Sequence, residues 1–141
     1  MPPKKLAALD VGTARIGIAV TDDSQNLALP YGTIHLKQTS DPIAEIASCL
    51  KSLDITHVIV GWPLELDGTE GPAIRRTKQF LAQFKARFPE FRFKPQDERM
   101  TSVAAENALQ EMETQGSDKK NKVDAMAASL ILQMYLERNK R

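Results

Sequence analysis

The chain has 141 residues and a mass of 15.7 kDa, about the length of one domain. Its 42% hydrophobic and 26% charged residues are ordinary for a soluble globular protein, which excludes a disordered tail protein, a collagen-like fibre and a two-domain enzyme. The 19 basic and 18 acidic side chains leave a net charge of +1, so any contact with a polyanion must come from local basic clusters.

Short apolar segments predict three strands in the first part of the chain. The first covers Lys5–Asp10 and the second Ile16–Val20, and a glycine-containing loop joins them as a hairpin. A third, irregular strand over Leu27–Leu36 contains Pro30 and Gly32, which favours a place at the edge of the sheet.

Helices and strands alternate in the rest of the chain. Asp41 followed by Pro42 is typical of a helix start. The segments predicted after it are a helix to about Leu53, a buried strand over Thr56–Val60, a loop, a helix from about Pro72 to Phe88, a strand over Phe91–Pro95, a helix from Thr101 to about Met112, a polar loop over Gln115–Lys122 and a last helix from about Val123 to Arg138. The apolar stripe expected on the last helix is Val123, Met126, Ala127, Leu130, Ile131 and Met134.

This order of elements predicts an α/β fold with a mixed five-stranded sheet. Three antiparallel strands come first, then alternating βαβ units, with helices on both faces of the sheet. We expect one domain over residues 1–141. No apolar run approaches the roughly 18 residues of a membrane span, the N-terminus does not read as a signal peptide, and one cysteine excludes an internal disulfide. A cytoplasmic protein fits these features.

Acidic residues lie at three positions where chemistry is possible. Asp10 ends the first strand, Asp97 and Glu98 follow the last strand, and Asp124 begins the last helix. Each position also has a structural explanation. Asp10 can start a turn, the Asp97–Glu98 pair can favour a helix N-terminus, and Asp124 can complete a capping box with Asn121 as the N-cap.

These acids come from elements whose ends can converge at one end of a parallel core. Oxygen ligands without histidine or cysteine favour Mg²⁺ or Mn²⁺, and a pair of such ions can hydrolyse a phosphodiester. Several basic residues lie near these acids in the sequence. Each basic residue alone is typical of a solvated face, but together they could form a groove that binds a phosphate backbone. The basic residues are Arg15, Arg75, Arg76, Lys119, Lys120 and Lys122.

Four segments match a known family, in the same order and over most of the chain. They read LDVGTARIGIAVTD, VIVGWPLELDGTEGP, DERMTSVAAE and KKNKVDAMAASLILQMYL. The sequence resembles the YqgF family, also called RuvX or Holliday-junction-resolvase-like proteins. The resemblance implies a ribonuclease H-like fold with a two-metal carboxylate site formed by Asp10, Glu98 and Asp124, with Asp97 as the alternative to Glu98. It also implies a role in maturing the 5′ end of 16S rRNA in the bacterial cytoplasm.

The sequence departs from true Holliday-junction resolvases, which are more distant relatives. Those enzymes carry a glutamate at the end of the fourth strand, where this chain reads Val60-Gly61-Trp62-Pro63. This departure favours an RNA nuclease over a resolvase. The nearest alternative enzyme is a DNA junction resolvase, which needs a two-fold dimer. A non-catalytic RNA-binding accessory protein is a further alternative, and so is a nucleotide-binding fold. We expect the partner to be structured precursor rRNA, with branched DNA as the alternative, bound by a monomer or a homodimer.

Overall fold

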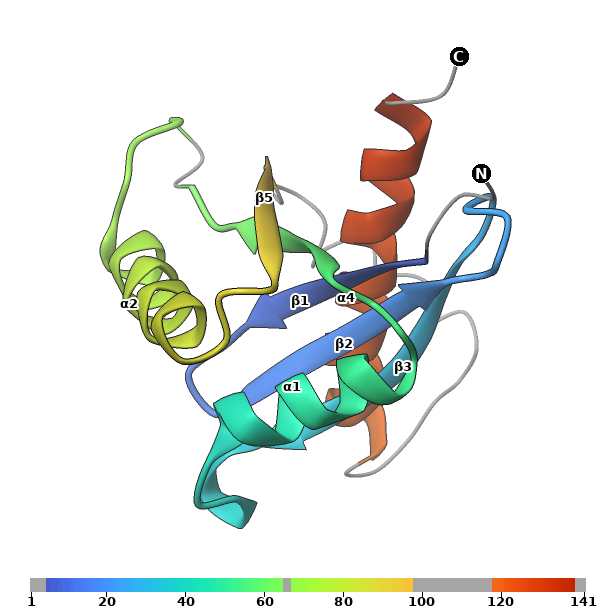
Figure 1. Cartoon of the computed structure of the whole chain (residues 1–141). Helices are drawn as coiled ribbons and strands as arrows, with labels where there is room; N and C mark the ends of the chain where they lie inside the picture. The colour runs from blue at the N-terminus through green and yellow to red at the C-terminus, as the bar shows by residue number, and fades with distance from the viewer. Residues whose placement is uncertain (1–4, 65–66, 98–117, 139–141) are drawn as a thin grey trace.

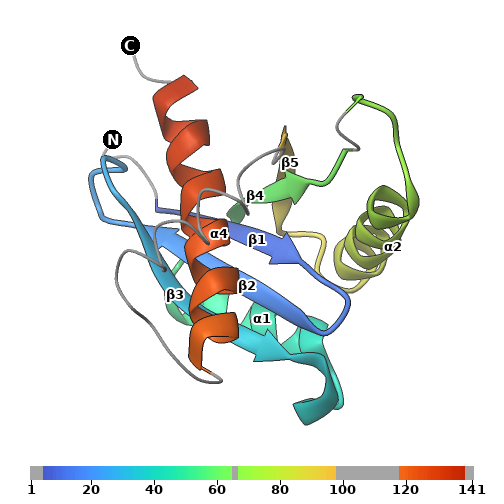
Figure 2. The ribbon, with the colours of Figure 1, turned by 180° about the vertical axis from the view of Figure 1, so that it is seen from behind.

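A five-stranded sheet lies between helices in the computed structural model, which describes residues 5–64, 67–97 and 118–138. Two helices, α1 and α2, cover one face of the sheet and α4 crosses the other (Figures 1 and 2). The elements are β1 (Leu6–Val11), β2 (Arg15–Thr21), β3 (Ala28–His35), a short 3-10 helix (Leu36–Gln38), α1 (Pro42–Ser52), β4 (His57–Trp62), α2 (Pro72–Arg87), β5 (Arg92–Asp97) and α4 (Asp118–Arg138). Within the described ranges, no helix is long and apolar enough to span a membrane.

The strand order β3-β2-β1-β4-β5 confirms the predicted mixed sheet. β1 pairs antiparallel with β2, and β2 antiparallel with β3. β1 and β4 run parallel, as do β4 and β5. The pairing of β2 with β3 shifts register between Ile18 and Ala19, where Ala19 faces Pro30. This irregularity follows from Pro30, which has no N–H to give to a ladder and is tolerated because β3 is an edge strand.

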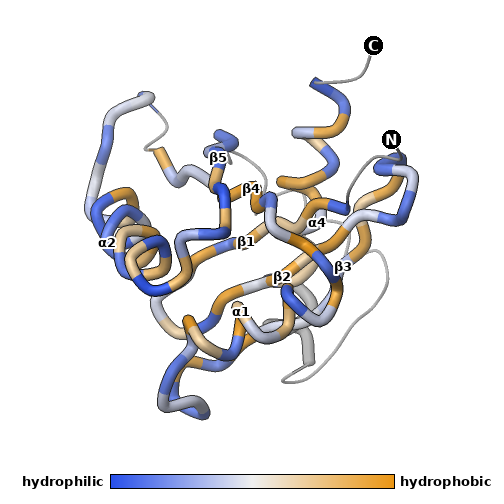
Figure 3. The backbone as a smooth tube through the Cα atoms, viewed as in Figure 1, coloured by the Kyte–Doolittle hydropathy of each residue, from blue (hydrophilic) through white to orange (hydrophobic). Residues whose placement is uncertain are grey.

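The larger core lies between the sheet and the α1–α2 layer. Side chains alternate along each strand, so Leu9 of β1, Ile18 of β2 and Val60 of β4 all point to this face. Figure 3 shows the hydrophobic residues of β1, β2 and β4 in orange. Phe84 of α2 is fully buried there. It meets four other aromatic rings edge to face, at centroid distances of 5.1 to 6.0 Å.

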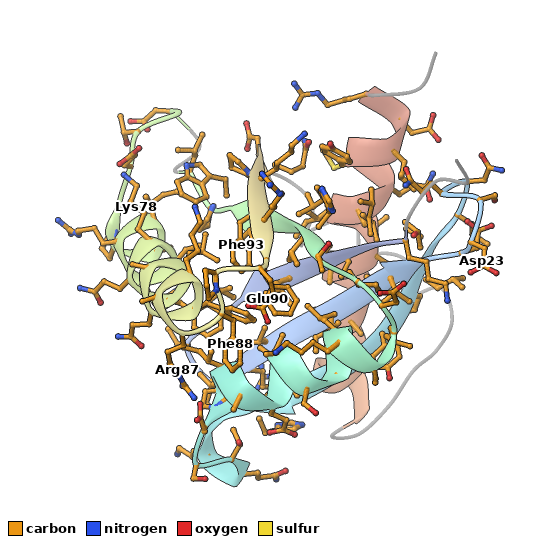
Figure 4. All side chains as sticks on the ribbon, viewed as in Figure 1. Asp23, Lys78, Arg87, Phe88, Glu90 and Phe93 are labelled. Carbon is orange, nitrogen blue, oxygen red and sulfur yellow. The ribbon has the colours of Figure 1, made fainter. Side chains whose placement is uncertain are left out.

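Phe88 and Phe93, two of those rings, are labelled in Figure 4. Edge-to-face packing is the arrangement that the ring quadrupoles favour. The cluster therefore fixes α2 against β5 and with it the position of the α2 N-terminus.

A smaller core lies under α4 and is built largely from small residues. Ala8 of β1 and Ala19 of β2 face Ala128 on the helix, together with Ile59, Ile131 and Leu132. Alanine side chains allow the helix backbone to approach the strands closely. As a result, backbone atoms of α4 can contact β2 directly.

Several predicted boundaries were wrong. The last helix begins at Asp118 rather than Val123, so part of the expected Gln115–Lys122 loop is helical and Asn121 is not an N-cap. The strand β5 extends to Asp97, which was expected in a loop, and β4 extends to Trp62. The helix expected over 101–112 lies outside the described residues.

The buried stripe of α4 also differs from the prediction. Met134 is exposed, whereas Ala125, Ala128 and Leu132 are buried. The α4 sequence is apolar on more than one side, so its periodicity does not select a face; the close approach to the strands does, by burying the side with the smallest residues.

Candidate active site

Asp10 lies near the carboxyl end of β1, on the face that carries α4. Two positions earlier, Ala8 packs under α4, and the strand alternation puts Asp10 on the same side. Its partner on β2 is Gly17. Residues directly opposite each other in an antiparallel pair share a face, so Asp10 and Gly17 both point towards α4. The Asp10 side chain is half-buried.

Gly17 brings Asp124 to this point of the sheet. A Cβ atom added at Gly17 would lie 2.1 Å from the backbone oxygen of Asp124 and 2.5 Å from its carbonyl carbon. No side chain fits in that gap, so the absence of one is what allows α4 to rest on β2 here. The first strand and the last helix thus bring Asp10 and Asp124 to the same small region, as the sequence predicts.

Arg15 completes this cluster. Its Nε atom donates a hydrogen bond to Oδ2 of Asp124 at 2.5 Å, and both side chains are more than two-thirds buried. The turn that carries Arg15 is tight, because the Gly12 N–H donates to the Arg15 carbonyl at 2.9 Å. This pair replaces the expected capping role of Asp124, which lies two turns inside α4 rather than at its start.

Asp97 lies on the opposite face. It pairs in register with Trp62, and both continue the alternation of Val60 and Phe93, which face α1 and α2. The preceding residue, Gln96, is buried on the α4 side, where its Oε1 accepts a hydrogen bond from Arg138 at 3.3 Å. Asp97 is therefore not brought together with Asp10 and Asp124. Glu98 lies outside the described residues.

The predicted basic residues separate into two groups. Arg75 and Arg76 lie in the first turns of α2, on the face of the sheet opposite Asp124. Arg75 is exposed, whereas Nε of Arg76 is buried without a hydrogen-bond partner among the described residues. The backbone of Lys119, Lys120 and Lys122 belongs to the first turns of α4, which lead to Asp124.

The donor set of this cluster suits a hard divalent ion. Asp10 and Asp124 supply carboxylate oxygens, the ligands that Mg²⁺ and Mn²⁺ prefer. Within residues 5–64, 67–97 and 118–138, no group of three or more acidic, histidine or cysteine residues lies close enough to hold a metal. A divalent ion at this cluster would therefore need a further protein ligand besides Asp10 and Asp124.

Sequence reasoning missed the residue that joins the two acids. Gly17 falls within the strand predicted over Ile16–Val20, and the sequence alone assigns it no role of its own. A glycine at the centre of an otherwise branched strand is the available signal, because such a glycine often marks close approach of another backbone. Gln96 and Arg138 were also missed, since their contact spans 42 positions in the chain.

Sequence comparisons relate the chain to a known protein family. The RuvX family model, described as "Holliday junction resolvase", matches residues 4–138. A protein of Fusobacterium nucleatum named "Putative pre-16S rRNA nuclease" is 36% identical over 138 residues, which is 97% of this chain and 99% of that protein. A protein of the same name from Roseiflexus sp. is 34% identical, over 96% of this chain and 95% of its own length.

Structure comparisons show the same fold in solved proteins. Fowlpox virus resolvase, solved with Holliday junction DNA, superposes with a TM-score of 0.58 at 16% identity and covers 98% of this chain and all of its own. RuvC of T. thermophilus, solved with a Holliday junction substrate, gives a TM-score of 0.56 at 15% identity and covers 97% of each chain. At these identities the likeness establishes the fold alone, and it confirms the predicted ribonuclease H-like architecture.

Proposed function

This chain belongs to the RuvX family, and we propose that it is a metal-dependent nuclease that processes the 5′ end of pre-16S rRNA. Its relatives at about a third identity, matched over nearly their whole length, bear the name of such a nuclease. The proposed substrate is structured precursor RNA, and the proposed reaction is hydrolysis of a phosphodiester bond.

One observation carries the proposal. Asp10 and Asp124 are 114 positions apart in the chain, yet they flank the contact between Gly17 and the α4 backbone on one face of the sheet. Helix capping does not explain this arrangement, because Asp124 does not cap its helix. Two carboxylates held on rigid elements at a strand end are what a metal-dependent phosphodiesterase requires.

Asp10, Asp124 and Glu98 are the proposed metal ligands. Asp97 is the weaker choice for the third position, because its side chain takes the α2 face of β5. Two Mg²⁺ or Mn²⁺ ions bound there would supply activation of a water and stabilisation of the leaving oxygen. The chain's own residues set the geometry: β1 fixes Asp10, and α4 fixes Asp124.

Arg15 has a positioning role in this proposal. Its guanidinium holds one oxygen of Asp124, which orients the carboxylate and leaves the second oxygen available for a metal. The guanidinium also offers further N–H donors to a phosphate beside the cluster. Arg75 and Arg76 on α2, with the lysines of the first α4 turns, are proposed to hold the phosphate backbone on either side.

The test is cleavage of a pre-16S rRNA 5′ fragment and of a four-way DNA junction by the whole protein, in Mn²⁺, in Mg²⁺ and in EDTA. We expect cuts in the RNA that need the metal and that Asp10→Asn abolishes. Asp23→Asn is the matched control, because it removes an acid that is 92% exposed, in the β2–β3 turn. Cleavage in EDTA, or unchanged cleavage by Asp10→Asn, would contradict the proposal.

A DNA junction resolvase is the second candidate, because the matching family model carries that description. It requires a two-fold dimer that presents two sites to a symmetric junction. Cleavage of the junction but not of the RNA, by a protein that is dimeric in solution, would select it. A folded protein that binds the RNA and cuts neither substrate would instead be an accessory RNA-binding protein.

A further inference from the structure

A cavity of about 640 Å³ opens at the other end of the sheet from Asp10. Its walls come from the amino ends of β1 and β4, from β5, from the C-terminal part of α2 and from the last turns of α4. Leu6, which lines it, is four residues before Asp10 on β1, or about 13 Å along the strand. The cavity is therefore separate from the carboxylate cluster but within reach of the same nucleic-acid strand.

Three cations line this cavity, and its lining contains no acid among the described residues. Lys85 of α2 and Arg92 and Lys94 of β5 are exposed there, and His57 adds a ring nitrogen. None of the three cations has an ion pair with a described residue. Five other described cations do have one; they are Lys5, Arg15, Lys51, Lys78 and Arg87.

This contrast matters in a protein whose net charge is close to zero. A cation that is paired with a neighbouring carboxylate attracts an anion only weakly, because the two charges largely cancel at a distance. Lys85, Arg92 and Lys94 keep their full charge, on two elements that converge on one concave surface. Such a local excess attracts a polyanion in spite of the balanced composition.

Aromatic surface accompanies the charge. Tyr135 on α4 and Phe93 on β5 line the cavity and are half-buried, so part of each ring remains accessible. Phe93, labelled in Figure 4, packs edge to face against Phe84, with 5.1 Å between the two ring centroids. Cations beside fixed aromatic rings are the combination that binds single-stranded nucleic acid, through phosphates and stacked bases.

We propose that this cavity binds a single-stranded segment of the substrate that flanks the bond to be cut. Lys85, Arg92 and Lys94 contact its phosphates, and Tyr135 stacks on a base. The strand would run along the α4 face from the cavity towards Asp10. This inference rests in part on the proposed nuclease function, since it assigns the bound strand to that enzyme's substrate, but binding itself does not depend on turnover.

The test measures binding of a short, fluorescently labelled single-stranded oligoribonucleotide by anisotropy, in EDTA, across a salt series. Lys94→Glu and Arg92→Glu are expected to weaken binding at low salt. Each should also reduce the slope of log affinity against log salt by about 0.7 for every phosphate that the variant no longer neutralises. Lys37→Glu is the matched control, because Lys37 is also exposed, lies outside the cavity and has no ion pair among the described residues.

Stacking is tested separately. Tyr135→Leu is expected to weaken binding about fivefold or more, whereas Tyr135→Phe keeps the ring and should bind as the wild type does. The ring-retaining variant separates the loss of stacking from a general loss of packing under α4.

The proposal is overturned if Lys37→Glu weakens binding as much as Lys94→Glu does, because the effect would then be one of net charge. It is also overturned if poly-glutamate displaces the oligonucleotide at an equal concentration of charge, since the cavity would then be a general anion site suited to an acidic protein. Cavity-dependent binding by a protein that cuts no RNA would uphold the binding of a single strand here, and would reject both the nuclease proposal and the assignment of that strand to its substrate.

Discussion

Gly17 illustrates how one residue positions a site without taking part in its chemistry. Because Gly17 has no side chain, it leaves space for the Asp124 carbonyl group next to β2. Because Asp10 lies directly across the β1–β2 ladder from it, any displacement of α4 at this point also moves Asp124 away from Asp10. Packing and function are therefore coupled at this position.

We expect Gly17→Ala to destabilise the protein by about 1–3 kcal/mol, the usual cost of forcing extra atoms into a packed interior. The added Cβ would meet backbone atoms of α4, which cannot rotate away as a side chain can. Chemical denaturation measures the change in the free energy of unfolding. Metal-dependent cleavage should fall as well, because α4 must shift.

Gly32→Ala is the matched control for that experiment. Gly32 lies in β3, and nothing stands within 4 Å of a Cβ added there. We expect this variant to be as stable as the wild type or slightly more so, since alanine loses less backbone freedom on folding. Equal destabilisation by the two substitutions would refute the close-approach explanation.

At the scale of elements, an exposed ion pair joins the two helices of the larger layer. Asp41 caps α1 by accepting a hydrogen bond from the Ala44 N–H at 3.1 Å. Arg87, in the last turn of α2, donates to both carboxylate oxygens of Asp41 at 2.7 and 2.8 Å. The start of one helix is thereby tied to the end of the other.

This pair predicts a dependence of stability on acid. The hydrogen bonds from Arg87, supported by the Ala44 N–H, lower the pKa of Asp41 from 3.8 to about 2. A carboxyl whose folded-state pKa is depressed stabilises the fold above its unfolded pKa, and this contribution is lost as the pH falls from 3.8 towards 2. Asp41→Asn should therefore lose less stability than the wild type over that interval.

Thermal unfolding across the same pH interval measures the difference. High salt should reduce it, because the pair is exposed to solvent. Asp54→Asn is the control, since Asp54 is an exposed acid with no ion pair in the part of the chain that the structure describes. If Asp41→Asn and Asp54→Asn follow the same pH profile, the Arg87 contact does not stabilise the fold.

The elements that sequence predicted best are those with local signals. The start of α1 was correct because Asp41 and Pro42 are an N-cap and a first-turn proline in one short segment. The start of α4 was wrong because lysine, asparagine and aspartate are compatible with an exposed helical turn as well as with a loop. The end of β5 was wrong for a different reason: Gln96 is buried, and Arg138, which donates a hydrogen bond to it, is distant in the sequence.

The candidate site could be predicted to a similar extent. Asp10 is a candidate because it lies near the end of a recognisable strand, and Asp124 because the sequence predicts a helix start beside it, although the structure places it two turns inside α4. Their proximity was not derivable from either segment, since it depends on the absence of a side chain at Gly17. To predict the face on which Asp97 lies, one must know where β5 ends and how it is in register with β4. The periodicity of a short, polar edge strand does not define either.

At the scale of the whole molecule, the sheet separates two helical layers that differ in what they contain. The α1–α2 layer contains the larger core and the aromatic cluster of Phe84, which stabilise the sheet. The α4 layer contains the carboxylates near the carboxyl end of β1, and the cationic cavity lies at the other end of the sheet, between α4, β5 and the C-terminal part of α2. This division predicts that cleavage takes place on the α4 face, and that Asp97 on the opposite face is not needed for it.

The most direct test of this account is the rate of Mn²⁺-dependent RNA cleavage by Asp10→Asn, Asp124→Asn and Asp97→Asn, each shown to be folded. We expect the first two to lose more than about 100-fold, since residues that merely support metal ligands already contribute about 10–100-fold. Asp97→Asn should cleave at close to the wild-type rate, because its side chain lies across the sheet from the other two. An Asp97→Asn protein as inactive as Asp10→Asn would contradict the placement of the site on the α4 face.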